Sequence, residues 1–448
     1  MRIKRTSQIS IFDQFSQHEI GLELAAMSEW LDQHPGVLDF VAEDLGLSSV
    51  KATGRRGMTA ESVLRCALLK QHRQLSYQEL AFHLLDSASF QSFARLPVQF
   101  TPKKSALQAN IGALLASTWE ALNRCLLGDA KQSRIETGKM MRLDSTVTDA
   151  PIHEPSDSSL LWDSMRTLVR LLLRAEQLPG APLLAWRNHS RVAKKRARAI
   201  FYVRGKEKKA RLYKDLVQVT QNTLNYVRQV QLCMTIAKVS GCEFEQWQAQ
   251  VSHYTPLIER IIDQTQRRVF AGESVPAKEK VLSLFEDHTD LIIKGSRDIQ
   301  YGHKLNLTSG RSGLILDVVI EQGNPADSER FLPMLDRHIE LYGYPPRQAA
   351  ADGGYASGAN ITAAKKRGVK DVAFHKKRGL TIEQMVKSQW VYRKLRNFRA
   401  GIEAGISCLK RAYGLSRCTW KGLAHFQAYV WSSVVAHNLA LLTRLKSA

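Results

Sequence analysis

The pattern of hydrophobic and polar positions predicts helices in the first part of the chain. From about residue 17 to 130 the apolar residues recur at helical spacing, with few stretches of strand-like alternation. One helix start is marked by Ser76 and Glu79, which have the spacing of a capping box. Thr101, followed by proline, predicts a second start. We therefore expect an all-α N-terminal domain over residues 1–135, which is either a helix-turn-helix-like DNA reader or a small dimerisation bundle.

The remainder of the chain changes from strand to helix and back to strand. A short apolar strand at 140–147 is followed by a long helical segment at about 157–285. The later elements are two strands joined by a turn-rich connection, a helix, a strand, a helix, a strand and a helix, at 299–307, 314–321, 330–343, 348–352, 359–367, 371–375 and around Glu403. This order predicts an α/β fold in which a mixed sheet is covered by helices. The apolar stretch at 423–442 is interrupted by polar residues, so we interpret it as a buried helix rather than a membrane span.

The charge of the chain points to a polyanionic partner. Lys and Arg number 64 against 42 Asp and Glu, a net charge of +22 over 448 residues. Phosphate contacts dominate protein–DNA affinity, so this excess favours double-stranded DNA over a membrane, although a merely basic protein would share it. The strongest basic run spans 187–214, opposed only by Glu207, and contains the candidate DNA-backbone residues Lys194, Lys195, Arg196 and Arg198. The alternative for this run is a solvated helix face.

Several classes of protein are disfavoured by missing patterns. The six cysteines form no C-x-x-C pair, which argues against a zinc ribbon or a disulfide framework and is typical of reduced thiols in the cytoplasm. No G-x-x-x-x-G-K-[ST] phosphate loop occurs, so we expect no dependence on ATP. The first fifteen residues contain no uninterrupted apolar segment of the signal-peptide kind.

Three carboxylates on separate predicted elements suggest metal-assisted chemistry on nucleic acid. Arg399, Glu403 and Lys410 are spaced so that all three project within an arc of about 40° on one helix face. Asp144 ends one short apolar stretch, and Asp352 ends the slim strand that precedes Gly353 and Gly354. Carboxylates that converge in this way are suited to hold Mg²⁺ ions for phosphoryl chemistry. Lower-ranked rivals include Asp298, before a strand, and Asp149, which would replace Asp144 if the first strand ended later.

These residues carry a resemblance to a known family. The segments RLDSTVTDAPIHEP, AAADGGYAS and RNFRAGIEAGISCLKRAYG resemble the catalytic blocks of DDE transposases from bacterial insertion sequences. The last segment is similar to the family's Y-x2-R-x3-E-x6-K signature, with Arg399, Glu403 and Lys410 at the required spacings and Arg396 at the tyrosine position. The layout is closest to the insertion-sequence group labelled ISNCY.

The resemblance implies a ribonuclease-H-like catalytic domain formed by 136–156 and 286–448, with a basic helical insertion at 157–285 after the first strand. It implies that Asp144, Asp352 and Glu403 are catalytic and bind two Mg²⁺ ions, with Mn²⁺ as a substitute. Arg399, Lys410 and Arg396 would bind DNA phosphates.

The implied activity is cleavage at transposon ends and transfer of the freed 3′-OH into target DNA. The partners would be the terminal inverted repeats and target DNA, bound by a homodimer or a larger assembly in the cytoplasm at the nucleoid. Two alternatives remain open: a ribonuclease-H-fold nuclease or resolvase without strand transfer, and a non-catalytic, transposase-derived DNA-binding regulator.

Overall fold

The computed structural model describes residue 4 and residues 18–46, 57–96, 100–294, 298–375 and 379–447. The chain folds into two compact units. The first consists of Met1–Pro151 and His303–Ala448, and the second of Ile152–Gly302. The second unit is therefore inserted into the first after one strand has been formed.

Helices make up the first unit up to residue 132. They are α1 (Glu19–Gln33), α2 (Val37–Asp44), α3 (Ala60–His72), α4 (Tyr77–Asp86), α5 (Ala88–Ala94), α6 (Lys104–Gly112) and α7 (Ala116–Gln132). The predicted capping box is confirmed, because Ser76 accepts from the Glu79 N–H and the Glu79 carboxylate accepts from the Ser76 N–H. The predicted start at Thr101 is wrong: α6 begins at Lys104, after Lys103 in extended conformation and without a side-chain cap.

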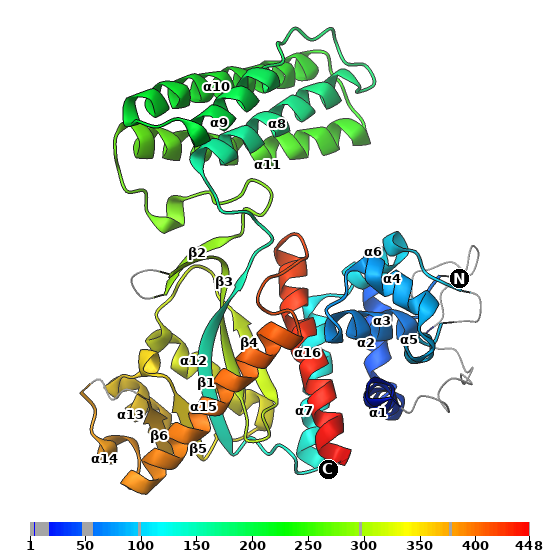
Figure 1. The fold of residues 1–448 in the computed structure, drawn as a ribbon, viewed down its shortest axis with the longest axis vertical. Coiled ribbons are helices and arrows are strands. Elements are labelled where there is room, and N and C mark those ends of the chain that lie inside the picture. Colours follow the sequence, from blue (N-terminus) through cyan, green and yellow to red (C-terminus); the bar gives the residue numbers. More distant parts are fainter. Residues whose placement is uncertain are drawn as a thin grey trace. The chain divides into compact units, whose positions relative to one another are not determined.

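The C-terminal helix α16 (Leu423–Ser447) lies against α7 and also packs on α3 (Figure 1). Its polar residues have buried partners, which explains how polar interruptions occur in a core helix. Asn438 donates to Asn123 Oδ1 at 2.7 Å and accepts from the Ile315 N–H at 2.9 Å. The prediction of a buried helix here is confirmed, and no helix among the described residues is long and apolar enough to cross a membrane.

The first unit also contains most of a mixed sheet, which confirms that part of the predicted fold. Its strands are β1 (Met140–Asp149), β2 (Asp290–Lys294), β3 (Asp298–Ser309), β4 (Ile315–Ile320), β5 (Gln348–Ala351) and β6 (Asp371–Phe374). The order is β2-β3-β1-β5-β6, with β4 paired to β3. β1, β5 and β6 run parallel, whereas β3 pairs antiparallel with β2 and β4. The sequence pattern did not predict β2.

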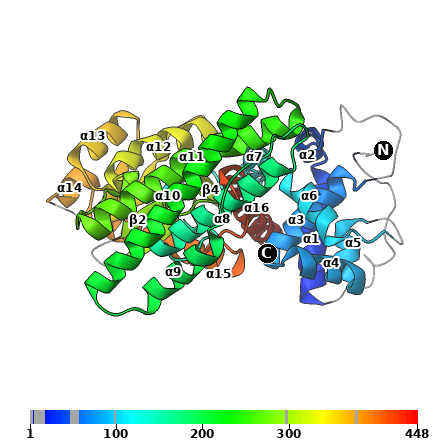
Figure 2. The ribbon, with the colours of Figure 1, turned by 90° about the horizontal axis from the view of Figure 1, so that it is seen from above.

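Helices cover both faces of this sheet. Figures 1 and 2 show α12 (Asp327–Tyr342) and α13 (Gly358–Lys366) on one face and α15 (Gln389–Ala412) on the other. The short α14 (Ile382–Met385) precedes α15. Alternate residues of β1 divide between the two faces: Met141 and Leu143 join the apolar cluster with Phe331 of α12. Because successive strand residues point to opposite faces, Arg142 and Asp144 are directed toward α15.

The second unit is a bundle of helices. It contains α8 (Asp157–Glu176), α9 (Ser190–Tyr202), α10 (Lys206–Ile236) and α11 (Cys242–Thr265), which share one apolar cluster. Trp247 is fully buried there, and its indole N–H donates to the Leu171 carbonyl at 2.9 Å. A short π-helix (Gln266–Phe270) and a 3-10 helix (Ala277–Glu279) connect α11 to β2.

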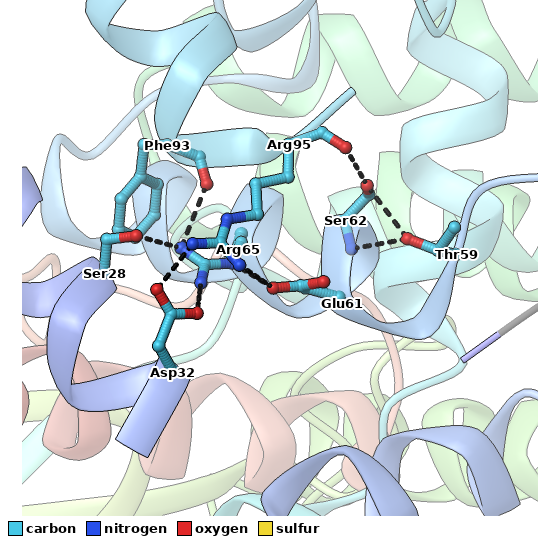
Figure 3. A network of polar contacts seen from close by, with 8 residues as sticks. All are labelled: Ser28, Asp32, Thr59, Glu61, Ser62, Arg65, Phe93 and Arg95. Atoms are coloured by element: carbon cyan, nitrogen blue, oxygen red, sulfur yellow. Dashed lines mark hydrogen bonds and ion pairs between the residues drawn. The ribbon is translucent and has the colours of Figure 1, made fainter. Parts of the chain in front are cut away.

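A buried ionic network joins α1, α3 and the end of α5 (Figure 3). Arg65 donates to Glu61 Oε1 at 3.1 Å and to Asp32 Oδ1 at 3.0 Å. Arg95 donates to the same two carboxylates, at 2.9 Å and 2.5 Å. The Arg65 side chain is 1% exposed, and its burial, together with the charge of Arg95, lowers its pKa to about 10. The arginine therefore stays charged at neutral pH, and the network holds three helices in one arrangement.

We predict that Arg65→Met destabilises the first unit by about 3–5 kcal/mol, because removing one partner of a buried ion network leaves the other charges uncompensated. Urea unfolding followed by circular dichroism measures this loss. The matched control is Arg124→Met, which removes a half-exposed ion pair with Glu120 and is expected to cost about 0.5 kcal/mol or less. Equal losses for the two variants would contradict a structural role for the network.

Candidate active site

Asp144 lies in the middle of β1, not at its end. The sequence indicated that the strand ended near Val147 with Asp144 terminating its apolar part, but β1 continues to Asp149. The reason is that Asp149 is held by the segment after α15: its N–H donates to the Ser416 carbonyl at 3.0 Å, and its carbonyl accepts from the Cys418 N–H at 2.8 Å. The strand is therefore extended by a distant part of the chain.

Asp144 and Asp352 lie side by side because their strands are paired in parallel. Leu143 of β1 is the register partner of Ala351 of β5, so the residue after each of them is an aspartate. Gly354 then lets the chain turn close to α12, since a Cβ on Gly354 would lie 2.6 Å from Asp327 Oδ2. The strand pairing thus brings together two carboxylates that are more than 200 residues apart in the sequence.

Arg399 of α15 is the point at which the three predicted carboxylates meet. Its Nη2 lies 2.9 Å from Asp144 Oδ2 and 3.6 Å from Asp352 Oδ1. Its Nη1 lies 2.6 Å from Glu403 Oε1, one helical turn further along α15. One guanidinium therefore links a strand, the end of a second strand and a helix.

The exposure of these groups increases from the sheet outward. Side-chain exposure is 10% for Arg399, 14% for Asp144, 39% for Asp352 and 56% for Glu403. Burial raises the pKa of Asp144, and the nearby Asp352 acts in the same direction, while Arg399 and the Ser145 N–H oppose the rise. Asp144 is thus the anchored member of the group, whereas Glu403 and Asp352 are open to a substrate from solvent.

Arg142 is a supporting residue that the sequence analysis missed. From β1 it donates to Ser309 Oγ at 2.6 Å and to the Phe398 carbonyl of α15 at 2.9 Å. A Cβ on Gly401 would lie 1.8 Å from Arg142 Nη1, so glycine at that position is what lets the guanidinium reach α15. The sequence did contain a sign of this role: Arg142 and Asp144 alternate on one face of the strand, and the helix that covers this face carries a glycine.

Lys410 lies on the same helix as Arg399 but interacts electrostatically with a different carboxylate of β1. Its electrostatic partner is Asp149, and burial lowers the pKa of Lys410 while Asp149 opposes that shift. Eleven helical residues and five strand residues each rise about 16.5 Å, so the spacing from Arg399 to Lys410 on α15 equals the spacing from Asp144 to Asp149 on β1. Lys410 is consequently not part of the carboxylate group around Arg399.

Arg396 stands at the tyrosine position of the C-terminal signature, and the nearby tyrosine, Tyr392, has a structural role. Arg396 is exposed on α15 and forms no ion pair among the described residues. Tyr392, one turn earlier, is buried, and its hydroxyl donates to the Phe374 carbonyl at 2.9 Å. Tyr392 therefore fastens the start of α15 to the end of β6.

Residues 289–439 match the family model for the transposase DDE domain. The matched segment includes Asp352, Arg399 and Glu403 and covers about a third of the chain, but Asp144 precedes it. The match supports a DDE transposase, a class of DNA-binding enzymes. No curated protein and no solved structure matches the chain.

Transposases with this domain generally use divalent metal ions, and the carboxylates here have suitable chemistry for one. Three carboxylates already surround a single positive charge, the Arg399 guanidinium, and hard oxygen donors are the ligands that Mg²⁺ prefers. In the described part of the chain no group of three acidic, His or Cys residues is gathered closely enough to hold an ion as it stands. Arg399 fills the space between the carboxylates, so it serves as their counter-ion in this structure.

The basic residues predicted to contact DNA lie in the other compact unit. Lys194, Lys195 and Arg198 are exposed on α9, whose Ala193 and Ile200 face the bundle core. Arg196 differs from these neighbours, because its Nε lies 3.2 Å from Asp215 of α10. The run that contains only one acidic residue in the sequence therefore acquires a second compensating carboxylate through folding.

We predict that Arg399→Gln lowers the free energy of unfolding of the first unit by about 1–3 kcal/mol, because the carboxylates lose their counter-ion; the open positions of Asp352 and Glu403 keep the effect modest. Millimolar Mg²⁺ should restore much of this stability in the variant. Thermal unfolding with and without Mg²⁺ measures both effects. Arg367→Gln, which breaks the exposed pair with Asp336, is the control. It should lose little stability, and Mg²⁺ should not change its thermal unfolding. A variant as stable as wild type and insensitive to Mg²⁺ would contradict the counter-ion role.

Proposed function

We propose that this chain is a DNA transposase that cleaves at transposon ends and transfers the freed 3′-OH into target DNA. The observation that carries the proposal is the convergence of Asp144, Asp352 and Glu403 on Arg399. A surface that only binds DNA gains nothing from three carboxylates facing phosphate, whereas phosphoryl chemistry requires them. The family match over the segment that carries Asp352 and Glu403 supports the same reading.

Asp144, Asp352 and Glu403 would hold the divalent ions, which we propose to be two Mg²⁺ with Mn²⁺ as a substitute. When bound, such ions activate the attacking oxygen and stabilise the leaving oxygen. Asp144, anchored by the Ser145 N–H at 2.8 Å, would fix the position of the site on the sheet. The more exposed Glu403 would adjust from the helix side. Residues from two strands and one helix thus share the task of orienting the scissile phosphate.

The proposed reaction has two steps, and the protein is chemically unchanged by both. In the first, water attacks a phosphodiester at the transposon end, the bond from phosphorus to the 3′ oxygen breaks, and that oxygen leaves as a 3′-OH. In the second, the 3′-OH attacks a phosphodiester of target DNA, a new bond from phosphorus to that 3′ oxygen forms, and the 3′ oxygen of the target strand leaves as a 3′-OH. No bond to the protein forms. Arg399, once released from the carboxylates, and Lys410 would position phosphates or terminal bases, because both are strong donors to phosphate oxygen.

We propose that the basic helix α9 contributes to DNA binding outside the reaction centre. Lys194, Lys195 and Arg198 are exposed and have no ion-pair partner among the described residues. We propose that they contact backbone phosphates of double-stranded DNA, with Arg196 contributing less because of Asp215. Arg396, exposed on α15, is the corresponding candidate beside the reaction centre.

The remaining parts of the proposal follow from the reaction. Two transposon ends have to be brought together, so we propose a homodimer or a larger assembly on the terminal inverted repeats, working at the nucleoid. Residues 1–135 would recognise the ends or form the dimer. Within the DDE transposases we propose a relationship to the insertion-sequence group labelled ISNCY, with Arg396 in place of the tyrosine of the C-terminal signature.

We predict that Asp352→Asn reduces both nicking and joining at least about a hundredfold, the scale expected when one group that stabilises developing charge is removed. The assay uses purified chain, Mg²⁺ or Mn²⁺, and a labelled duplex carrying the element's own terminal repeat. Asp336→Asn, at an exposed ion pair on α12, is the control and should retain activity. Cleavage without joining by wild type would favour a nuclease or resolvase, and tight binding without cleavage would favour a regulator.

A further inference from the structure

A pocket of about 480 Å³ lies in the first unit between the helices near the N-terminus and the segment that follows α15. One wall comes from Lys70, Tyr77 and Lys104, at the end of α3 and the starts of α4 and α6. The opposite wall comes from Arg417 and Trp420, more than 300 residues later in the chain. The pocket is separate from the carboxylates, because none of Asp144, Asp352 and Glu403 lines it.

Hydrogen bonds hold the two walls together. Gln71 donates to the Tyr413 carbonyl at 2.6 Å and to Ser433 Oγ at 2.7 Å. Gln74 donates to the Arg411 carbonyl at 2.6 Å. Within the later segment, the Tyr429 hydroxyl donates to the Gly414 carbonyl at 2.9 Å. These contacts fix the later segment against α3, so the pocket is part of the folded structure and needs no rearrangement to form.

The Lys70 ammonium is buried without a directly bonded polar partner among the described residues. The residue is 5% exposed, and its ammonium lies 4.8 Å from the Tyr77 ring centroid and 5.7 Å from that of Trp420. Across the described residues, this ammonium forms neither a hydrogen bond nor an ion pair. Buried cations are normally paired, because desolvation of an ammonium costs several kcal/mol. Burial lowers the pKa of Lys70 to about 8, while Cys418 and Glu79 act in the opposite direction, so the group is still a cation at neutral pH.

The acidic residue near Lys70 is already used elsewhere. Of the described residues that line the pocket, Glu79 is the acidic one, and its carboxylate accepts from the Ser76 N–H at 2.7 Å in the capping box. A second buried donor, the Trp420 indole N–H, has no hydrogen-bond acceptor in the described part of the chain. The pocket therefore combines an excess of positive charge with donors that lack acceptors.

We propose that this pocket binds a phosphate group, with the Lys70 ammonium as its buried cationic donor. Phosphate fits because it offers several acceptor oxygens to the cations and hydroxyls of the two walls, Lys70, Lys104, Arg417, Ser416 and Thr419. The aromatic rings of Tyr77 and Trp420 supply apolar surface for an attached sugar or base, and the volume exceeds that of a bare anion. The phosphate comes either from a DNA backbone or from a free nucleotide.

This inference goes beyond the proposed function, since neither cleavage nor joining uses the pocket. Its test compares wild type, Lys70→Met and Lys131→Met. Lys131 is the matched control because its ammonium also lies over two aromatic rings, at 5.7 Å and 5.2 Å, but donates to the Tyr342 carbonyl and does not line the pocket. Binding of inorganic phosphate and of dAMP is measured by calorimetry, and binding of a labelled duplex by fluorescence anisotropy over a range of salt concentrations.

We expect Lys70→Met to weaken binding of one class of probe roughly ten- to hundredfold, the effect of losing a hydrogen bond to a charged group, while Lys131→Met changes it less than about twofold. If the phosphate belongs to DNA, duplex binding weakens and the slope of log K against log salt falls by about one. If it belongs to a nucleotide, dAMP and phosphate binding weaken and duplex binding is unchanged.

The proposal is overturned if a folded Lys70→Met variant binds phosphate, dAMP and duplex like wild type. Should that variant not fold, Lys104→Met decides, because Lys104 is exposed and is a second cation that lines the pocket; unchanged binding of all three probes would then overturn the proposal. Loss of probe binding in Lys70→Met and loss of cleavage in Asp352→Asn are separate readouts on residues of separate sites, so a failure of the proposed catalysis is distinguishable from a failure of the pocket.

Discussion

Mutual repulsion among Asp144, Asp352 and Glu403 has to be offset before the site can form, and the Arg399 guanidinium is the group that does so. It reaches all three carboxylates within 3.6 Å from a position that is 90% buried. A buried charge needs partners in good geometry, and here each charge supplies the partner of another. The arrangement explains how the three acidic residues can lie close together: the Arg399 guanidinium supplies a compensating positive charge.

The position of Arg399 depends in turn on how α15 lies on the sheet. Arg142 crosses from β1 to the Phe398 carbonyl through the space left by Gly401, and Tyr392 fastens the start of the helix to β6. Further along, Lys410 interacts electrostatically with Asp149 of the same strand. Because eleven helical residues and five strand residues cover the same length, one orientation of α15 satisfies both ends. The packing of α15 on the sheet thus determines where Arg399 lies relative to the carboxylates.

The sequence predicted which strands and helices form better than it predicted where each begins and ends. Strand and helix periodicity located the mixed sheet, and the capping box at Ser76 is local, so both were accessible without the structure. The full length of β1 was not, because its last residues are held by the Ser416 and Cys418 backbone from the far end of the chain. Arg142 was missed for the same reason: its importance arises from the space above Gly401, which only tertiary packing creates.

We propose that Asp144, Asp352 and Glu403 form one divalent-cation site and that the Arg399 guanidinium is a counter-ion of the same three carboxylates. Anomalous diffraction from crystals grown with Mn²⁺ tests it most directly, with Asp352→Asn as the comparison. The account predicts manganese peaks bound by these three carboxylates in wild type and weakened or missing peaks in the variant. Crystals in which Arg399 keeps all three ion pairs and manganese binds only elsewhere would contradict it.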